Sequence, residues 1–319
     1  MVYKNLYIIG NGFDIHHGIK SRFSDYREWQ ENNNPDLYSK LVELYEDASA
    51  GEWWNDFENH LADFNILEYA YRLGFENQPD FASDDFRESD RYVAQLKAEK
   101  TFSLLSEEIR DSLYKWISQL SMPEETRIKI DHDDSFFLTF NYTHTLEDIY
   151  NIPNDQVLHI HGSIHEEESI IYGHGTDRSI MNNRVQRSLP KPPAKESLSE
   201  DAYYDVISDY EIDYSTQLAI DATLSGVMSL QKNVKDIIIN NASFFQQISE
   251  IENVYVYGFS FSPIDMPYLE EILRRTNPET HWVISWVSQE DQKRISDFVI
   301  KNEIQNITLI NGIKTISTQ

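Results

Sequence analysis

The chain has 319 residues, 40% of them hydrophobic, with 54 acidic and 27 basic residues and a formal net charge of −27. Its length is sufficient for a sizeable core, and the absence of cysteine excludes disulfides, cysteine zinc sites and a cysteine nucleophile. The acidic balance argues against nucleic acid and anionic membranes as partners. Because neither a signal-peptide core nor a membrane-spanning run is visible, we expect a cytoplasmic protein without a membrane partner.

The first element is a short strand over residues 3–9, where a continuous apolar run ends at Gly10. Such a run is typical of a strand covered on both faces. Between residues 20 and 130 the apolar spacing changes to three and four residues, which predicts amphipathic helices. We interpret one aromatic stripe there as core between helices: Trp53, Trp54, Phe57, Leu61 and Phe64.

Strand signals return in the second half of the chain. The further segments that we interpret as strands are residues 134–140, 156–162, 253–259, 281–288 and 307–310. Residues 165–200 show little periodicity and predict a long loop, and residues 201–250 predict helices. Alternating strands and helices imply right-handed crossovers and a parallel sheet.

We therefore expect an α/β fold with a Rossmann-like parallel sheet flanked by helices. Residues 1–19 and 131–319 would form this domain, and residues 20–130 a large helical insertion after the first strand. The long loop contains a basic run, which we interpret as solvated surface rather than a nucleic-acid site. This run comprises Arg178, Arg184, Arg187, Lys191 and Lys195.

Polar turns follow several of the strands. The first contains Gly10, Asn11, Gly12, Phe13 and Asp14. Glycines allow a sharp turn and a close approach to a ligand, and a following helix would present amide groups to phosphate. Without a ligand, the same residues would form a plain strand-to-helix turn with Asp14 as a helix cap.

Three later turns carry further candidates. Asn141 follows the second strand and could hold a ribose hydroxyl or a water, or cap the next helix. His161 precedes a glycine at the end of the third strand and suits general base chemistry. Gly258, Ser260 and Asp265 belong to a turn that contacts a nucleotide or simply starts a helix. Because carboxyl ends of parallel strands meet at one edge, we expect these turns to converge.

Two alternatives use some of the same residues. A strand would place His159 on the same face as His161. A metal could in principle be held by His159, His161, His165 and His174 with Asp14, but no His-Glu-x-x-His pattern or dense carboxylate cluster accompanies them, so we expect no metal. The turn at 258–262 resembles a nucleophile elbow, but its last position is Ser262 and only one histidine follows, which argues against a hydrolase triad.

Taken together, several segments resemble the AbiH family of bacteriophage abortive-infection proteins. They are residues 8–26, 137–150, 159–162, 170–175 and 254–269. Their order is also similar, more distantly, to that of SIR2-like domains, which bind NAD in a Rossmann-like sheet. That resemblance assigns Asn141 and His161 as residues that support NAD hydrolysis. Asn11 and Asp14 depart from the small residues usual in the first turn, and a zinc-ribbon deacetylase lacks its cysteines here.

The resemblance implies an anti-phage effector that hydrolyses NAD at the nicotinamide–ribose bond. Cleavage creates an oxocarbenium-like centre that needs an oriented water, a base and a pyrophosphate site, but no metal. Asn141 would orient water or ribose, and His161 would accept a proton. The resemblance also implies a trigger protein of phage or host origin and allows a homo-oligomer. The alternatives are a non-catalytic nucleotide-sensing module and a metal-dependent phosphoesterase or nuclease.

Overall fold

The sheet places the polar turns side by side. The computed structural model describes residues 3–123, 128–130, 132–165, 167–192, 206 and 210–312. Six strands, all parallel, lie in the order β3-β2-β1-β4-β5-β6. Their bounds are β1 Asn5–Ile9, β2 Ser135–Thr139, β3 Val157–His159, β4 Asn253–Tyr257, β5 His281–Trp286 and β6 Ile307–Asn311. Chain order reverses between β1 and β4, which is the switch point where ligands bind in such sheets.

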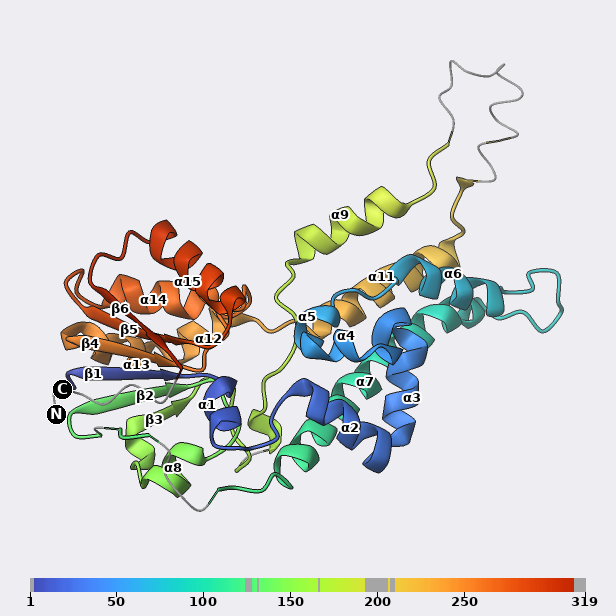
Figure 1. Cartoon of the computed structure of the whole chain (residues 1–319). Coiled ribbons are helices and arrows are strands. Elements are labelled where there is room, and N and C mark those ends of the chain that lie inside the picture. The colour runs from blue at the N-terminus through green and yellow to red at the C-terminus, as the bar shows by residue number, and fades with distance from the viewer. Residues whose placement is uncertain are drawn as a thin grey trace.

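Both faces of the sheet are covered, which explains why its strands are apolar rather than alternating. Helices α12 (Val234–Asn240), α13 (Ala242–Gln247), α14 (Met266–Arg275) and α15 (Gln289–Lys301) cover one face. Helices α1 (Asn11–His16) and α8 (Thr145–Tyr150) lie on the other (Figure 1). The predicted Rossmann-like α/β fold, with helices inserted after the first strand, is thus confirmed.

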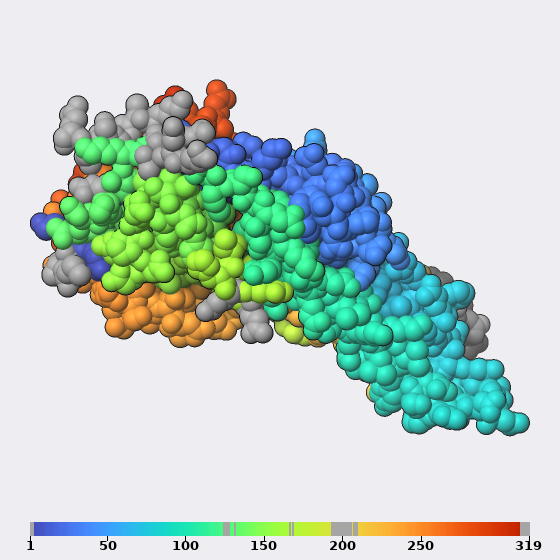
Figure 2. Space-filling model, turned by 90° about the horizontal axis from the view of Figure 1, so that it is seen from below, coloured from blue at the N-terminus to red at the C-terminus, as the bar shows by residue number. Residues whose placement is uncertain are grey.

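A second layer of helices projects from the sheet (Figures 1 and 2). Its helices are α2 Phe23–Asn33, α3 Pro35–Leu44, α4 Gly51–Asn55, α5 Phe57–His60, α6 Ile66–Glu76, α7 Val93–Ile117, α9 Arg178–Ser188 and α11 Tyr214–Ser229. The predicted aromatic stripe from Trp53 to Phe64 is buried in its core. Because α11 packs on α6 and α7, later parts of the chain also contribute to this layer, and the boundaries at 20 and 130 stay predictions. In the described part of the chain, no helix is long and apolar enough to cross a membrane.

Two local expectations are wrong. The predicted loop at 165–200 contains α9, whose only buried residues are Met181 and Val185. Two apolar contacts give too weak a periodicity to reveal a helix. Arg178, Arg184 and Arg187 of the basic run lie on this helix, whereas Lys195 lies outside the described residues.

The second concerns β3, which ends at His159. His161 therefore lies in the turn after the strand and does not share a strand face with His159.

Candidate functional site

A cavity of about 380 Å³ lies at the carboxyl ends of β1, β2 and β4. Pairing of Ile9 with both Thr139 and Tyr257 brings the three following turns together. The helical layer closes the other side, with Glu58 from α5 and with Trp116 and Ile117 from the end of α7. Its volume is within the range of roughly 300–1,000 Å³ usual for small-molecule sites.

The structure brings most of the predicted site residues to this cavity. Those that line it are Gly10, Asn11, Gly12, Asp14, Asn141, His161, Gly258, Ser260 and Asp265. Phe13 does not line it, because α1 turns this ring into the core beneath the sheet, where it contacts His17 and Tyr150. The expected convergence of the four turns is therefore observed, without Phe13.

The glycines of the first and last turns pack against each other. A Cβ on Gly10 would lie 2.6 Å from the Gly258 carbonyl oxygen, and a Cβ on Gly12 would lie 2.7 Å from the Gly258 Cα. The amide of Gly10 donates to Tyr257, that of Gly12 to Gly258, and that of Phe13 to Gly10. These glycines are thus required by contact between two turns, and the three amides are already engaged rather than open to a phosphate.

Asp14 is a buried carboxylate anchored to the β2–α8 turn. Its two oxygens accept hydrogen bonds from the hydroxyls of Thr143, at 2.6 Å, and Thr145, at 2.8 Å. Burial raises the pKa of Asp14 to about 6, although both threonines and Asn141 oppose that shift. Asp14 therefore fixes the turn that carries Asn141 rather than capping its own helix, and it lines the cavity.

Asn141 presents an unpaired oxygen. Its Nδ2 donates to the Gly10 carbonyl at 3.3 Å, and its backbone amide donates to the Thr139 hydroxyl at 3.1 Å. The side chain is buried, and its Oδ1 has no hydrogen-bond partner among the described residues. A buried unpaired oxygen at a cavity wall is ready to accept a hydrogen bond from a ligand.

His161 faces Asp265 and a buried lysine. Its Nε2 lies 3.6 Å from Asp265 Oδ1, too far for a hydrogen bond. Burial, and to a smaller extent the charge of Lys232, hold the pKa of His161 well below 6.5, so the ring is neutral at pH 7. Burial likewise raises the pKa of Asp265 to about 6, although Lys232 opposes this shift.

Sequence reasoning missed Lys232 and Glu58. The Lys232 ammonium is fully buried, 2.8 Å from Glu58 Oε1 and 3.9 Å from Asp265 Oδ1. Burial alone would lower its pKa, but the two carboxylates outweigh that effect and raise it. Glu58 comes from the helical layer, Lys232 from the segment after α11, and Asp265 from the start of α14. No local pattern reveals such a network, because its members are far apart in the chain.

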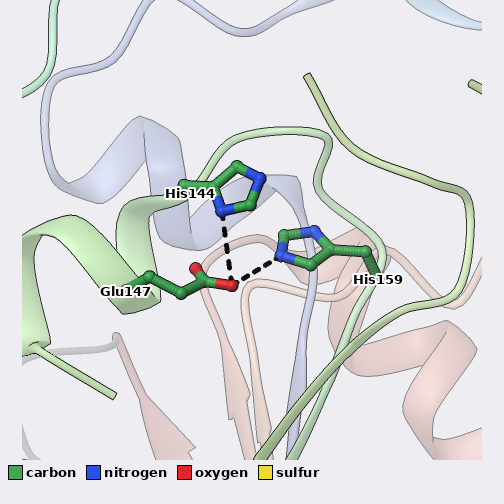
Figure 3. Close-up of side chains that lie close together, drawn as sticks. All are labelled: His144, Glu147 and His159. Atoms are coloured by element: carbon green, nitrogen blue, oxygen red, sulfur yellow. Dashed lines mark hydrogen bonds and ion pairs between the residues drawn. The ribbon is translucent and has the colours of Figure 1, made fainter. Parts of the chain in front are cut away.

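The histidines proposed as alternative metal ligands do not gather at one point. His174 has Nε2 against the Val227 carbonyl and Nδ1 against the Thr176 amide. His159 instead lies beside His144 and Glu147 (Figure 3). Glu147 is the carboxylate that the sequence pattern did not place near these histidines. Burial favours its neutral form, but His144 and His159 outweigh burial and lower the pKa of Glu147 to about 2.

Comparison with curated proteins gives no match to the chain. The family model for bacteriophage abortive infection AbiH proteins matches residues 6–286. That range covers the first five strands, the cavity turns and the helical layer. The chain therefore belongs to the AbiH family of bacteriophage abortive-infection proteins.

Proposed function

We propose that the chain acts in anti-phage abortive infection by hydrolysing NAD at the nicotinamide–ribose bond in this cavity. The observation that carries the proposal is a set of three buried polar atoms at its wall. Asn141 Oδ1, His161 Nε2 and Asp265 Oδ1 have no hydrogen-bond partner within the described part of the chain. Each such atom costs about 1–3 kcal/mol when left unpaired, and a bound sugar or water would satisfy all three.

The charge of the cavity suggests which part of NAD enters it. The acidic residues at its wall are Asp14, Asp56, Glu58, Asp265 and Asp291, and the described lining includes no Lys or Arg. The nicotinamide ring of NAD carries a positive charge until its bond to ribose breaks, whereas the pyrophosphate is negative. We therefore place the nicotinamide riboside half inside and the pyrophosphate at the mouth. Arg294 donates to the carbonyl of Ser260, which lines the cavity, at 3.1 Å, and we assign it to the pyrophosphate.

The reaction then follows from the positions of three side chains. Asn141 Oδ1 accepts a hydrogen bond from ribose or from the attacking water. The bond between the ribose carbon and the ring nitrogen breaks, its electron pair goes to nicotinamide, and the water oxygen bonds to the ribose carbon. The neutral His161 accepts the proton that this water loses, and Asp265 stabilises the resulting imidazolium. The proposed reaction needs no metal ion.

The test follows NAD and free nicotinamide in phage-infected cells that express the chain, and in purified protein. Asn141→Ala and His161→Ala should abolish defence and lower nicotinamide release by about 10²–10⁴-fold with unchanged melting temperatures. His281→Ala is the matched control, because this histidine starts β5 and contacts Thr308. Full activity of a folded His161→Ala protein would refute its role as the base.

A second function, nucleotide binding without cleavage, is favoured by one observation: His161 Nε2 and Asp265 Oδ1 lie 3.6 Å apart, too far for the hydrogen bond that would orient a general base. It predicts that NAD raises the melting temperature while infected cells keep their NAD. If the two cavity variants folded and lost defence under those conditions, the binding function would replace the hydrolytic one.

A further inference from the structure

A second polar cluster lies outside the cavity. His144 precedes α8, Glu147 lies in its first turn, and His159 ends β3. Glu147 Oε1 is 2.8 Å from His159 Nε2 and 3.5 Å from His144 Nδ1 (Figure 3). The three side chains are at most 12% exposed, and none of them lines the cavity.

Both ring nitrogens of His159 lie against oxygen atoms. His159 Nδ1 lies 3.0 Å from the Asn141 carbonyl, and a carbonyl oxygen only accepts, so Nδ1 carries a proton. A neutral ring then has a lone pair on Nε2, which would face a carboxylate oxygen at 2.8 Å. Two acceptors repel at that distance, so the contact requires either a second proton on His159 or a cation between the two groups.

His144 provides a second, independent observation. Both of its ring nitrogens and Glu147 Oε2 are buried without a hydrogen-bond partner among the described residues. Its ring instead lies against that of His165, with centroids 3.7 Å apart and the two rings tilted by 41°. A buried imidazole that makes no hydrogen bond is costly, and extra protonation of His159 would leave this cost in place. A cation bound to His144 Nδ1 would provide a partner for that nitrogen.

We propose that His144, Glu147 and His159 bind one first-row divalent cation of the zinc class. Tetrahedral zinc with ligands at about 2.0–2.2 Å holds neighbouring ligand atoms about 3.3 Å apart, and the observed 2.8 and 3.5 Å separations bracket that value. Two imidazoles and one carboxylate suit zinc better than calcium or magnesium, which take oxygen ligands. The fourth position is left to a water.

The site would position the cavity wall without taking part in the reaction. A metal-binding histidine usually donates its other N–H to a carbonyl or carboxylate, which fixes its ring. Here that carbonyl belongs to Asn141, whose side chain lines the cavity. The cation would therefore tie the end of β3 to the segment leading from Asn141 into α8. This positioning role of the cation does not depend on which ligand the cavity binds.

The test uses the full chain purified without metal-chelating resins. We expect about one zinc per chain by elemental analysis, and a melting temperature that falls on chelation and recovers with zinc alone. Glu147→Gln keeps the shape of the side chain and should lower zinc affinity more than about 100-fold, since loss of a group that merely supports a ligand costs 10–100-fold. His132→Ala, at an exposed histidine near Asp133, should leave zinc content unchanged.

A direct measurement covers the case in which Glu147→Gln does not fold. X-ray absorption of the zinc-loaded wild-type chain should show only nitrogen and oxygen neighbours near 2.0–2.1 Å, because the chain has no cysteine. The proposal is overturned if the wild-type chain binds no zinc at micromolar concentrations, or if folded Glu147→Gln binds it equally well. The cluster would then be a histidinium–carboxylate pair. Because zinc content and melting temperature are read without NAD, this failure is distinct from failure of the proposed hydrolysis.

Discussion

Replacing Gly258 by alanine tests whether the glycines at the cavity serve the packing of two turns. Gly258 has a φ of +61°, and a Cβ there would lie 2.2 Å from the Phe13 nitrogen and 2.4 Å from the Gly12 carbonyl carbon. Both are backbone atoms, far inside the usual contact distance of about 3.5–4.0 Å. The variant must therefore move one turn away from the other, and with it the Ser260 and Asp265 side of the cavity.

Gly312 is the matched control. Its φ is +78°, but no atom of the described residues lies within 4 Å of the position of its Cβ. Both substitutions incur the left-handed penalty of about 1–2 kcal/mol and gain about 0.4–1 kcal/mol from a less flexible unfolded chain. Only Gly258→Ala adds overpacking, which typically costs about 1–3 kcal/mol.

Urea unfolding followed by circular dichroism measures the difference. We expect Gly258→Ala to lower the free energy of unfolding by about 1–3 kcal/mol more than Gly312→Ala does. Equal losses for the two variants would show that the turns separate freely. The glycines would then be explained by ligand approach rather than by mutual packing.

Three further predictions follow from the charged groups. Burial raises the pKa of Asp14 from 3.8 to about 6, so protonated Asp14 stabilises the fold fully below about pH 4 and this contribution is lost as the pH rises through 6. Between pH 4 and 7, the free energy of unfolding of the wild type in urea should fall by up to about 3 kcal/mol relative to that of Asp14→Asn. Parallel pH profiles for the two proteins would contradict this. Lys232→Met should lower the free energy of unfolding by about 3–5 kcal/mol in the same assay, because it leaves Glu58 and Asp265 without their cation. Adding Glu58→Gln should recover part of this loss, and no recovery would argue against the network. Arg294→Gln should raise the KM for NAD several-fold but leave that for nicotinamide riboside unchanged, and equal effects on both would remove it from the pyrophosphate site.

The strands were predictable because each is a short apolar run that ends in a polar turn. Burial on both faces makes that pattern independent of distant partners. The rule that ligands bind at the carboxyl ends of parallel strands then sufficed to predict that Asn141, His161 and Ser260 would line one cavity. It failed for Phe13, because a six-residue helix sets which side chains turn inward, and apolar periodicity over so short a segment is not informative.

The charged partners of the site were not predictable, because tertiary structure alone brings them together. Glu58 and Lys232 are separated by most of the helical layer in sequence, and each has an ordinary local context. His144 and Glu147 were different, since a spacing of three residues at the start of a helix places them on one face. That pattern together with His159 was a signal in the sequence, but polar residues at this spacing are equally typical of an ordinary capped helix start.

The buried lysine makes the chemistry of the cavity depend on the helical layer. Glu58, from that layer, holds the Lys232 ammonium at 2.8 Å, and Asp265 lies 3.9 Å from it on the other side. If α5 moved away, Asp265 would be the carboxylate of this network that remains beside Lys232. The ammonium would then pair more closely with Asp265, because a buried ammonium without a carboxylate partner is strongly destabilised. Closer pairing would lower the pKa of Asp265 and draw its charge away from His161. A partner protein that displaces the helical layer would therefore change the ionisation of the site directly, without contacting any residue at the ends of the strands.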